Sequence, residues 1–223
     1  FASNTSIAGP ITAYGGTITA NANLSSTLSG AAILLQGSKV VQSQGVTVQS
    51  TVGNITYTAT NTPWTANTEQ SVLIGGSTGS STIIDAQGGN ISLSGTFATT
   101  GVTNTGTNSD VTVFLRNSTV KTSGIGTISI NGNAYDNASS SGDFIWGIVL
   151  SETNLIQTGS GNISITGTPG KIRPNGRGVA ADGSTLKILS TSGTIQITDA
   201  MPSGHTLTNY TGAYFKPASA NAI

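Results

Sequence analysis

A short pattern recurs along most of the chain and strongly constrains the architecture that the chain can form. A glycine, a polar residue and an isoleucine stand together six times, and the isoleucines are Ile18, Ile55, Ile91, Ile128, Ile163 and Ile195. Subtraction of these numbers gives separations of 37, 36, 37, 35 and 32 residues. A near-constant period of this length is typical of a protein built from stacked repeats.

Each period contains three short apolar segments, which we interpret as three β-strands. In one period they are Ile91–Leu93, Val111–Leu115 and the segment that leads to Val120 after a polar turn. Alternation of apolar and polar residues places the repeated isoleucines inside and their Thr, Ser and Asn neighbours outside. The polar turns carry a hydroxyl residue at matching places, which predicts a ladder of Ser38, Ser81, Ser118, Thr153 and Ser184 along one edge.

Three strands in each period predict one coil of a right-handed parallel β-helix, with residues 1–223 forming a single segment of about six coils. Coils of this kind stack at about 4.8 Å, so like residues lie above like. An alternative divides each period into two shorter coils, but each period has only one Gly-polar-Ile strand. The connections after the first strand vary in length, and stacking predicts that they lie on one face: 60–70, 97–109, 133–144, 168–177 and 199–211.

The composition fits a folded β-protein. Charged residues make up 7% of the chain and the net charge is zero, whereas ordinary soluble domains contain about 25% charged residues. Recurrent β-branched runs argue against disorder, and the lack of cysteine excludes disulfides and thiolate metal sites. The balanced charge predicts no basic surface for binding nucleic acid, and no apolar run is long enough to predict membrane insertion.

Particular units of the chain resemble a known group of proteins. The run Gly161–Thr168, followed by Gly178–Ala180 and Gly183–Leu186, is similar to the repeats of filamentous haemagglutinin-like exoproteins. These are large bacterial adhesins of the two-partner-secretion and related autotransporter classes, and the resemblance covers about residues 15–215. It implies a secreted β-helical rod at the bacterial cell surface, with a role in adhesion, aggregation or biofilm. The secretion domain that opens such exoproteins is not evident in this sequence.

A search for catalytic chemistry gives no candidate. The eight acidic residues fall in different places of the repeat, apart from Glu152 near Asp182, so no carboxylate dyad for glycan cleavage is expected. Arg116 and Glu152 occupy neighbouring turns and predict an exposed ion pair. His205 is the only histidine, and a metal site would need three or four ligands. We therefore expect no catalytic residue, no metal and no cofactor.

Contact residues are expected in or beside the variable connections. Aromatic rings suit stacking on sugars, and a basic cluster suits an acidic glycan or a neighbouring protein. The alternative interpretation is that the rings fasten the connections to the scaffold and that the cations are solvated. The candidate residues are Trp64, Tyr135, Trp146 and Tyr210 among the aromatics, and Lys171, Arg173 and Arg177 among the cations.

The sequence therefore predicts a structural segment of a secreted bacterial adhesin or cell-surface filament, acting as a stiff spacer. Its expected partners are neighbouring repeats or further copies placed end to end, together with surface glycans, and we expect the rod to continue beyond both ends. One alternative is a polysaccharide-active enzyme or carbohydrate-binding module on the same scaffold. Another is an ice-binding solenoid, suggested by Thr17 with Thr19 and by Thr56 with Thr58 but weakened by Ser92, Ser129 and Gln196.

Overall fold

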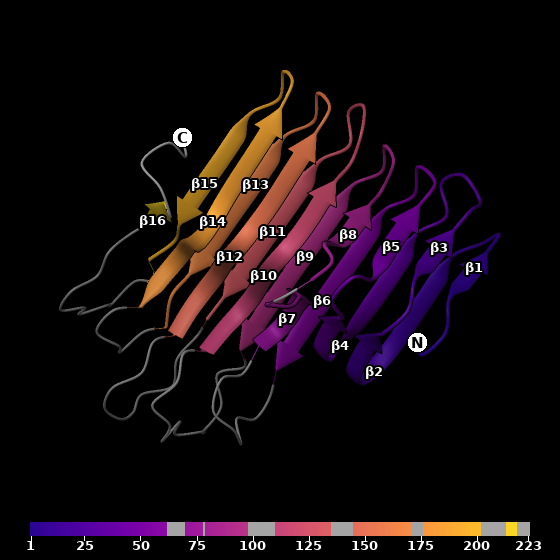
Figure 1. Ribbon diagram of the computed structural model, residues 1–223, viewed down its shortest axis with the longest axis horizontal. Coiled ribbons are helices and arrows are strands. Elements are labelled where there is room, and N and C mark those ends of the chain that lie inside the picture. The colour runs from indigo at the N-terminus through magenta and orange to yellow at the C-terminus, as the bar shows by residue number, and fades with distance from the viewer. Residues whose placement is uncertain are drawn as a thin grey trace.

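The protein is described by a computed structural model that covers residues 1–61, 70–77, 79–97, 110–134, 145–170, 176–201 and 213–217. Within these residues the regular structure is entirely β, and sixteen strands pair in parallel in one continuous sheet. The strands run side by side across the long axis of the molecule (Figure 1). This confirms an all-β fold with parallel pairing and is consistent with a β-solenoid.

Register divides the strands into three columns, and like strands of successive passes of the chain stack in each column. The first column holds the first halves of β2 (Ile11–Ala20) and β4 (Ile33–Gln42), then β6 (Ile55–Asn61), β9 (Ile91–Phe97), β11 (Ile128–Asn133), β13 (Ile163–Thr168) and β15 (Ile195–Asp199). The second holds the second halves of β2 and β4, then β7 (Gln70–Gly75), the first parts of β10 (Asp110–Lys121), β12 (Ile145–Thr158) and β14 (Arg177–Ser190), and β16 (Tyr214–Pro217).

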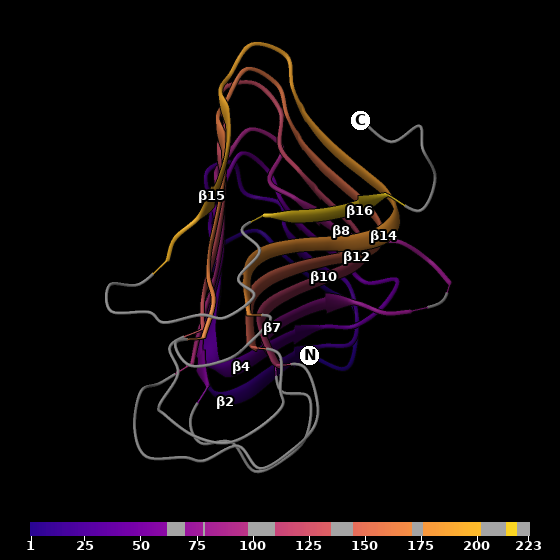
Figure 2. The same cartoon turned by 90° about the vertical axis from the view of Figure 1, so that its left-hand side faces the viewer.

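The third column holds β1 (Thr5–Ile7), β3 (Leu24–Ser26), β5 (Thr47–Ser50), β8 (Thr82–Asp85) and the last parts of β10, β12 and β14. The three columns form three walls around one interior (Figure 2). Each pass of the chain visits the first, second and third column in that order and then returns to the first. The strands therefore place repeated residues in line along the molecule.

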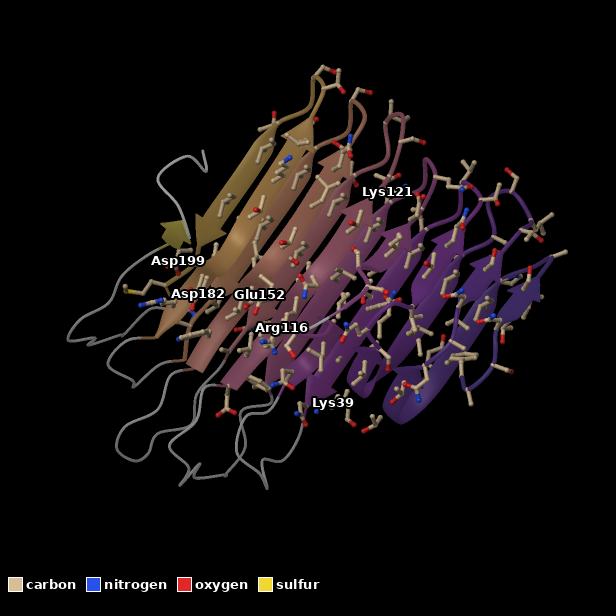
Figure 3. The ribbon with its side chains drawn as sticks, in the orientation of Figure 1. Lys39, Arg116, Lys121, Glu152, Asp182 and Asp199 are labelled. Atoms are coloured by element: carbon tan, nitrogen blue, oxygen red, sulfur yellow. The ribbon has the colours of Figure 1, made fainter. Side chains whose placement is uncertain are left out.

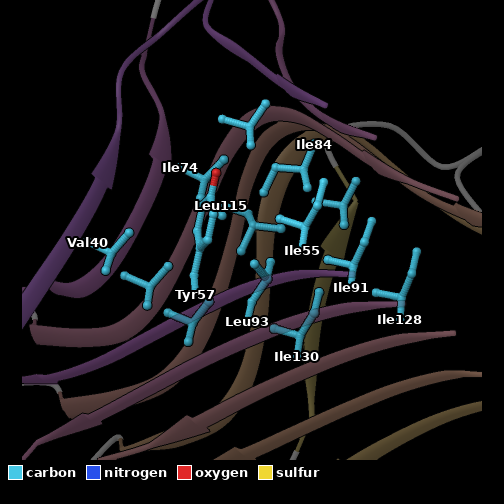
Figure 4. Packing of buried hydrophobic residues seen from close by; sticks show 14 of the residues in the cluster. Val40, Ile55, Tyr57, Ile74, Ile84, Ile91, Leu93, Leu115, Ile128 and Ile130 are labelled. Atoms are coloured by element: carbon cyan, nitrogen blue, oxygen red, sulfur yellow. The ribbon is translucent and has the colours of Figure 1, made fainter. Parts of the chain in front are cut away.

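The interior is filled by lines of aliphatic side chains (Figure 4). The longest line runs along the first column and consists of Ile11, Ile33, Ile55, Ile91, Ile128, Ile163 and Ile195. From Ile33 to Ile163 these side chains are at most 1% exposed. Burying such a side chain contributes roughly 1.5–3 kcal/mol relative to leaving it in water.

The prediction that Ile18 begins the isoleucine series is wrong. Ile18 pairs with Val40, which pairs with Val72, so Ile18 belongs to the second column. Ile33 pairs with Ile55 and so takes this place in the first column. The misassignment arises because the bend within β2 also carries glycine ahead of a polar residue and an isoleucine.

The Gly-polar-Ile motif marks the corner at which the third column leads into the first. A Cβ on Gly161 would lie 2.0 Å from the carbonyl oxygen of Gly126, and one on Gly53 would lie 1.9 Å from that of Ala31. Only glycine fits where two backbones approach so closely. The polar residue that follows completes the corner, because Oδ1 of Asn54 accepts a hydrogen bond of 2.9 Å from the backbone N–H of Asn90 in the next pass.

Buried hydroxyl groups satisfy the backbone on the inner side of this corner. Ser26, Ser50, Thr122 and Thr158 each donate a 2.7 Å hydrogen bond to a backbone carbonyl, those of Gly9, Ala31, Gly89 and Gly161 in turn. All four side chains are at most 5% exposed. These bonds cap carbonyls that would otherwise lie unsatisfied in an apolar interior.

The hydroxyl ladder predicted at the polar turns is not formed as expected. Ser118 pairs with Thr82 and Asn154 rather than with Ser81 and Thr153. The shift occurs because the register breaks between Arg116 and Ser118, where Asn117 has a positive φ of 47°. Ser118 Oγ still donates to Oδ1 of Asn154 at 2.8 Å, so polar bridges do link successive passes there.

One polar group crosses the apolar interior. Tyr57 is fully buried on β6 and its hydroxyl donates a 2.8 Å hydrogen bond to Oε1 of Gln42, which is also fully buried. The Gln42 amide in turn donates to the backbone carbonyls of Val46 and Ile83, each at 2.9 Å. Three walls are thereby joined by one hydrogen-bonded chain. Burial raises the pKa of the Tyr57 hydroxyl far above its ordinary value.

Candidate functional site

The edge between the first and second columns is where the longer connections leave the scaffold. Strands β6, β9, β11, β13 and β15 end there in a stack, and β7, β10, β12, β14 and β16 begin there in another. The connections themselves lie largely outside the described residues. Their anchor points do stack along one edge, as expected from the sequence.

Two of the sequence-predicted contact residues are brought together at this edge. Trp146 on β12 and Arg177 on β14 are partners in register, and the guanidinium carbon lies 5.6 Å from the centre of the indole ring. This distance is typical of a cation–π contact. The ring also packs against a small cluster of Val111, Val149 and Ala180, all of them at most 3% exposed.

The surroundings of Trp146 favour an anchoring role for the ring. The guanidinium lies over the indole ring while the ring also packs on the apolar cluster, so little of its surface is left for stacking on a sugar. The other five candidates, Trp64, Tyr135, Lys171, Arg173 and Tyr210, lie outside the described residues.

Several charged side chains of the described residues follow one another at the bend that ends the second column, where Arg116, Glu152 and Asp182 stand in successive passes (Figure 3). Nη2 of Arg116 lies 3.4 Å from Oε1 of Glu152, which confirms the predicted ion pair between neighbouring passes. Nζ of Lys121 lies 3.2 Å from Oδ2 of Asp85 on the third column. Among the described residues no three His, Cys, Asp or Glu side chains gather as a metal site would require, and His205 lies outside them.

The outer face of the second column is more apolar than sequence alternation suggested. Val41, Leu73, Phe114, Val149 and Ala180 follow one another in register on the side opposite the interior. The continuous apolar runs 72–74 and 148–150 indicate this apolar outer face in the sequence. Unbroken runs of this kind are typical of strands buried on both faces.

The outer face of the first column is polar and uncharged from β6 onward. One line of residues on this face consists of Thr56, Ser92, Ser129, Ser164 and Gln196, and the next of Thr58, Ser94, Asn131, Thr166 and Thr198. A third line, at the corner, is fixed by amide groups. There Oδ1 of Asn90 and Oδ1 of Asn162 accept 2.9 Å hydrogen bonds from the backbone N–H of Thr127 and Thr194. We call this surface the polar face.

Tyr14 stands at the N-terminal end of the second of these lines. It pairs in register with Gln36, which pairs with Thr58 on the polar face, and its side chain is 68% exposed. By contrast, Thr17 and Thr19 lie on the second column, away from Thr56 and Thr58. The two threonine pairs that suggested ice binding are therefore on different walls. Sequence reasoning missed Tyr14 because its neighbours in the line come from distant segments.

No helix that could cross a membrane is found in the part of the chain that the structure describes. Comparisons with models of protein families, with curated protein sequences and with solved structures found no match to this chain.

Proposed function

We propose that this chain is a right-handed parallel β-helical segment of a secreted bacterial adhesin or cell-surface filament, in which it acts as a stiff spacer. The observation that carries the proposal is the continuous register of the three columns, which stacks like residues over the full described length. Right-handed connection is the general preference of parallel crossovers. In this proposal each level of the isoleucine line belongs to one coil.

Stiffness follows from how the coils are joined. Successive coils are tied by backbone hydrogen bonds in all three columns as far as β14 and in the first two columns beyond it, and by side-chain bridges such as that from the Asn90 N–H to Asn54. Bending the rod would stretch one wall, and with it many of these bonds at once. A repeat scaffold of this kind transmits force along its axis while its surface stays available for contacts.

The C-terminal end of the columns supports contact with a further coil or a second copy. Ile195, the last residue of the isoleucine line, is 42% exposed, whereas Ile163 in the preceding coil is 1% exposed. At the other end Ile11 is 4% exposed. Residues before Ile11 contact the first coil there, and Ser26 Oγ donates to the Gly9 carbonyl. An exposed strand edge beside apolar residues invites further strand pairing.

A non-catalytic role is part of the same proposal. Glu152 and Asp85 each face a cation rather than a second carboxylate. Glycan cleavage would call for two carboxylates placed on either side of the scissile bond. A spacer has no such requirement.

Electron microscopy of native surface material would test the proposal. An antibody raised against this chain should label thin continuous fibres on cells that produce the protein, and cells that lack the gene should carry no label. Label confined to discrete compact particles would contradict the filament proposal. The same images would show whether the label repeats along a fibre or occurs once.

A further inference from the structure

The outward lines of residues on one wall of the described part carry no charge, although Asp199 ends β15 on that wall, in register with the buried Gly167. On the polar face every outward residue from Thr56 to Thr198 is Ser, Thr, Asn or Gln. Charged side chains lie instead on the third column, such as Asp85 and Lys121, or at the bend after the second, such as Arg116 and Glu152. A surface without charge offers nothing to an ionic partner, and its hydroxyl and amide groups match the neutral hydroxyls of a sugar.

The polar face is also regular and fixed. Its strands pair without a register break, whereas β10, β12 and β14 carry such breaks. Strand stacking gives a repeat of about 4.8 Å along the rod, which is close to the rise per sugar residue of an extended glycan. The Asn side chains at the corner are held by the next coil, so little conformational freedom remains to be lost on binding.

Tyr14 adds an aromatic surface to the same wall. Its exposed side chain lies in line with Gln36, Thr58 and Ser94. Aromatic rings provide a flat apolar surface on which sugar rings stack.

We propose that the polar face, with Tyr14 at its N-terminal end, binds a neutral polysaccharide that lies along the rod axis. The inference rests on the proposed function, because a surface adhesin requires a ligand. Single contacts on a flat polar surface are weak, so binding depends on many coils meeting many sugars at once. Affinity is therefore expected to rise steeply with glycan length, as it does for multivalent ligands.

The experiment measures retention of the purified chain on insoluble cellulose, chitin and a neutral β-1,3-glucan, with alginate as an anionic comparison. The chain is expected to bind at least one of the neutral polymers, with little dependence on salt. Tyr14→Ala should weaken this binding about three- to tenfold, as loss of an aromatic contact does. Tyr14→Phe should retain it, because the ring is kept.

Two further variants locate the surface. The double variant Ser129→Lys with Asn131→Lys places bulky charges at the centre of the polar face, where both residues are exposed, and should abolish retention. The control Ile125→Ala removes a side chain that is 83% exposed at a corner away from Tyr14, and should bind as the parent does. Circular dichroism of each variant checks that the fold is kept.

Several outcomes would overturn the inference. They are failure to bind any neutral polymer, salt-sensitive binding to alginate alone, and equal retention of the parent and both face variants. Failure of the filament proposal is distinguishable from these results. Fibres in the micrographs without glycan binding reject only the inference, whereas glycan binding by compact particles rejects only the proposed filament.

Discussion

The first two passes of the chain and the later ones build the same three columns with different lengths of chain. Ile11 to Ile33 and Ile33 to Ile55 are each 22 residues apart by subtraction, and β2 and β4 run from the first column into the second without interruption. From Ile55 onward the same step takes 36, 37, 35 and 32 residues. Most of the added residues enter at the corner between the first and second columns, although one pass also has a longer connection, 76–81, between β7 and β8.

The corner that leads into the first column varies little in length, and its close contacts explain why. The corner that leads into the first column is closed by glycines in contact with the neighbouring backbone and by buried hydroxyls, and both regions share it. At the corner between the first and second columns the backbones also approach closely, since a Cβ on Gly37 would lie 2.4 Å from the carbonyl oxygen of Gly16. The later coils supply their own anchors there, with Phe97 packed on Ala134 and Trp146 packed beside Arg177. An insertion therefore requires new apolar contacts but leaves the ladders intact.

The largest expected effect tests whether the corner that leads into the first column contributes equally to stability in the two regions. Gly53→Ala and Gly161→Ala should each destabilise the fold by about 3 kcal/mol, because the added methyl would overlap a carbonyl oxygen of the preceding coil. Denaturant unfolding followed by circular dichroism measures the loss. Gly124→Ala is the control, since its Cβ would meet nothing within 4 Å and only its φ of 57° opposes the change, at about 1 kcal/mol. Unequal effects of the first two would show that the corners differ.

The next effect lies at the boundary between the regions, where Tyr57 on β6 donates to Gln42 on β4. Tyr57→Phe should cost about 1–2 kcal/mol, because Gln42 Oε1 loses its buried donor. The pKa of Tyr57 is raised in the folded state, so its contribution is fully present below the unfolded value near 10 and is lost as the pH rises above it. The parent should lose up to about 1.4 kcal/mol per pH unit above 10 from this group, measured by denaturant titration at several pH values.

The pH dependence of the variant provides the control. Tyr57→Phe should lack this part of the alkaline slope, although other tyrosines and lysines still titrate. An identical slope in parent and variant would contradict the assignment of a raised pKa to Tyr57.

A smaller effect, this time a gain in stability, is expected at the corner before β6, where the coils with longer connections begin. Val52 has a φ of 63° and is 51% exposed, a conformation that a β-branched residue adopts only with strain. Val52→Asn should raise stability by about 1 kcal/mol, because Asn tolerates this conformation. Thermal unfolding would detect it as a higher Tm. Leu28→Asn, at a similarly exposed position, should leave the Tm nearly unchanged, and a gain of the same size there would indicate a general surface effect.

The smallest effect concerns the ion pair that links two inserted coils. Arg116 and Glu152 are about one-third exposed, so a double-mutant cycle with alanine should give a coupling below about 1 kcal/mol. High salt should reduce it further. A coupling of several kcal/mol would mean that these coils depend on charge for their cohesion, unlike the first two.

The same comparison explains how far the sequence could predict the structure. From Ile55 to Ile195 the inserted coils have one Gly-polar-Ile strand each, and the predicted alignment of their isoleucines is confirmed. In the short coils the same pattern also marks the bend of β2, so Ile18 was placed in the wrong column. The pair of Arg116 and Glu152 was predictable because the two residues lie in equivalent turns.

Other features depend on contacts between segments that no local pattern connects. The bond between Tyr57 and Gln42 crosses the interior, and the line from Tyr14 to Thr198 joins seven passes of the chain. Register shifts at Asn117 displaced the predicted hydroxyl ladder by one residue. Such shifts change the face on which a side chain lies, so alternation alone cannot place it.

The corner asparagines link each coil to the coil that follows it in the chain. Oδ1 of Asn54 accepts from Asn90, Oδ1 of Asn90 accepts from Thr127, and Oδ1 of Asn162 accepts from Thr194. In each bond the acceptor belongs to the earlier coil and the donor to the later one. A chain that emerges N-terminus first, as from a ribosome, therefore presents a finished template to each newly arriving segment. Growth of the rod can then proceed one coil at a time, without waiting for the end of the chain.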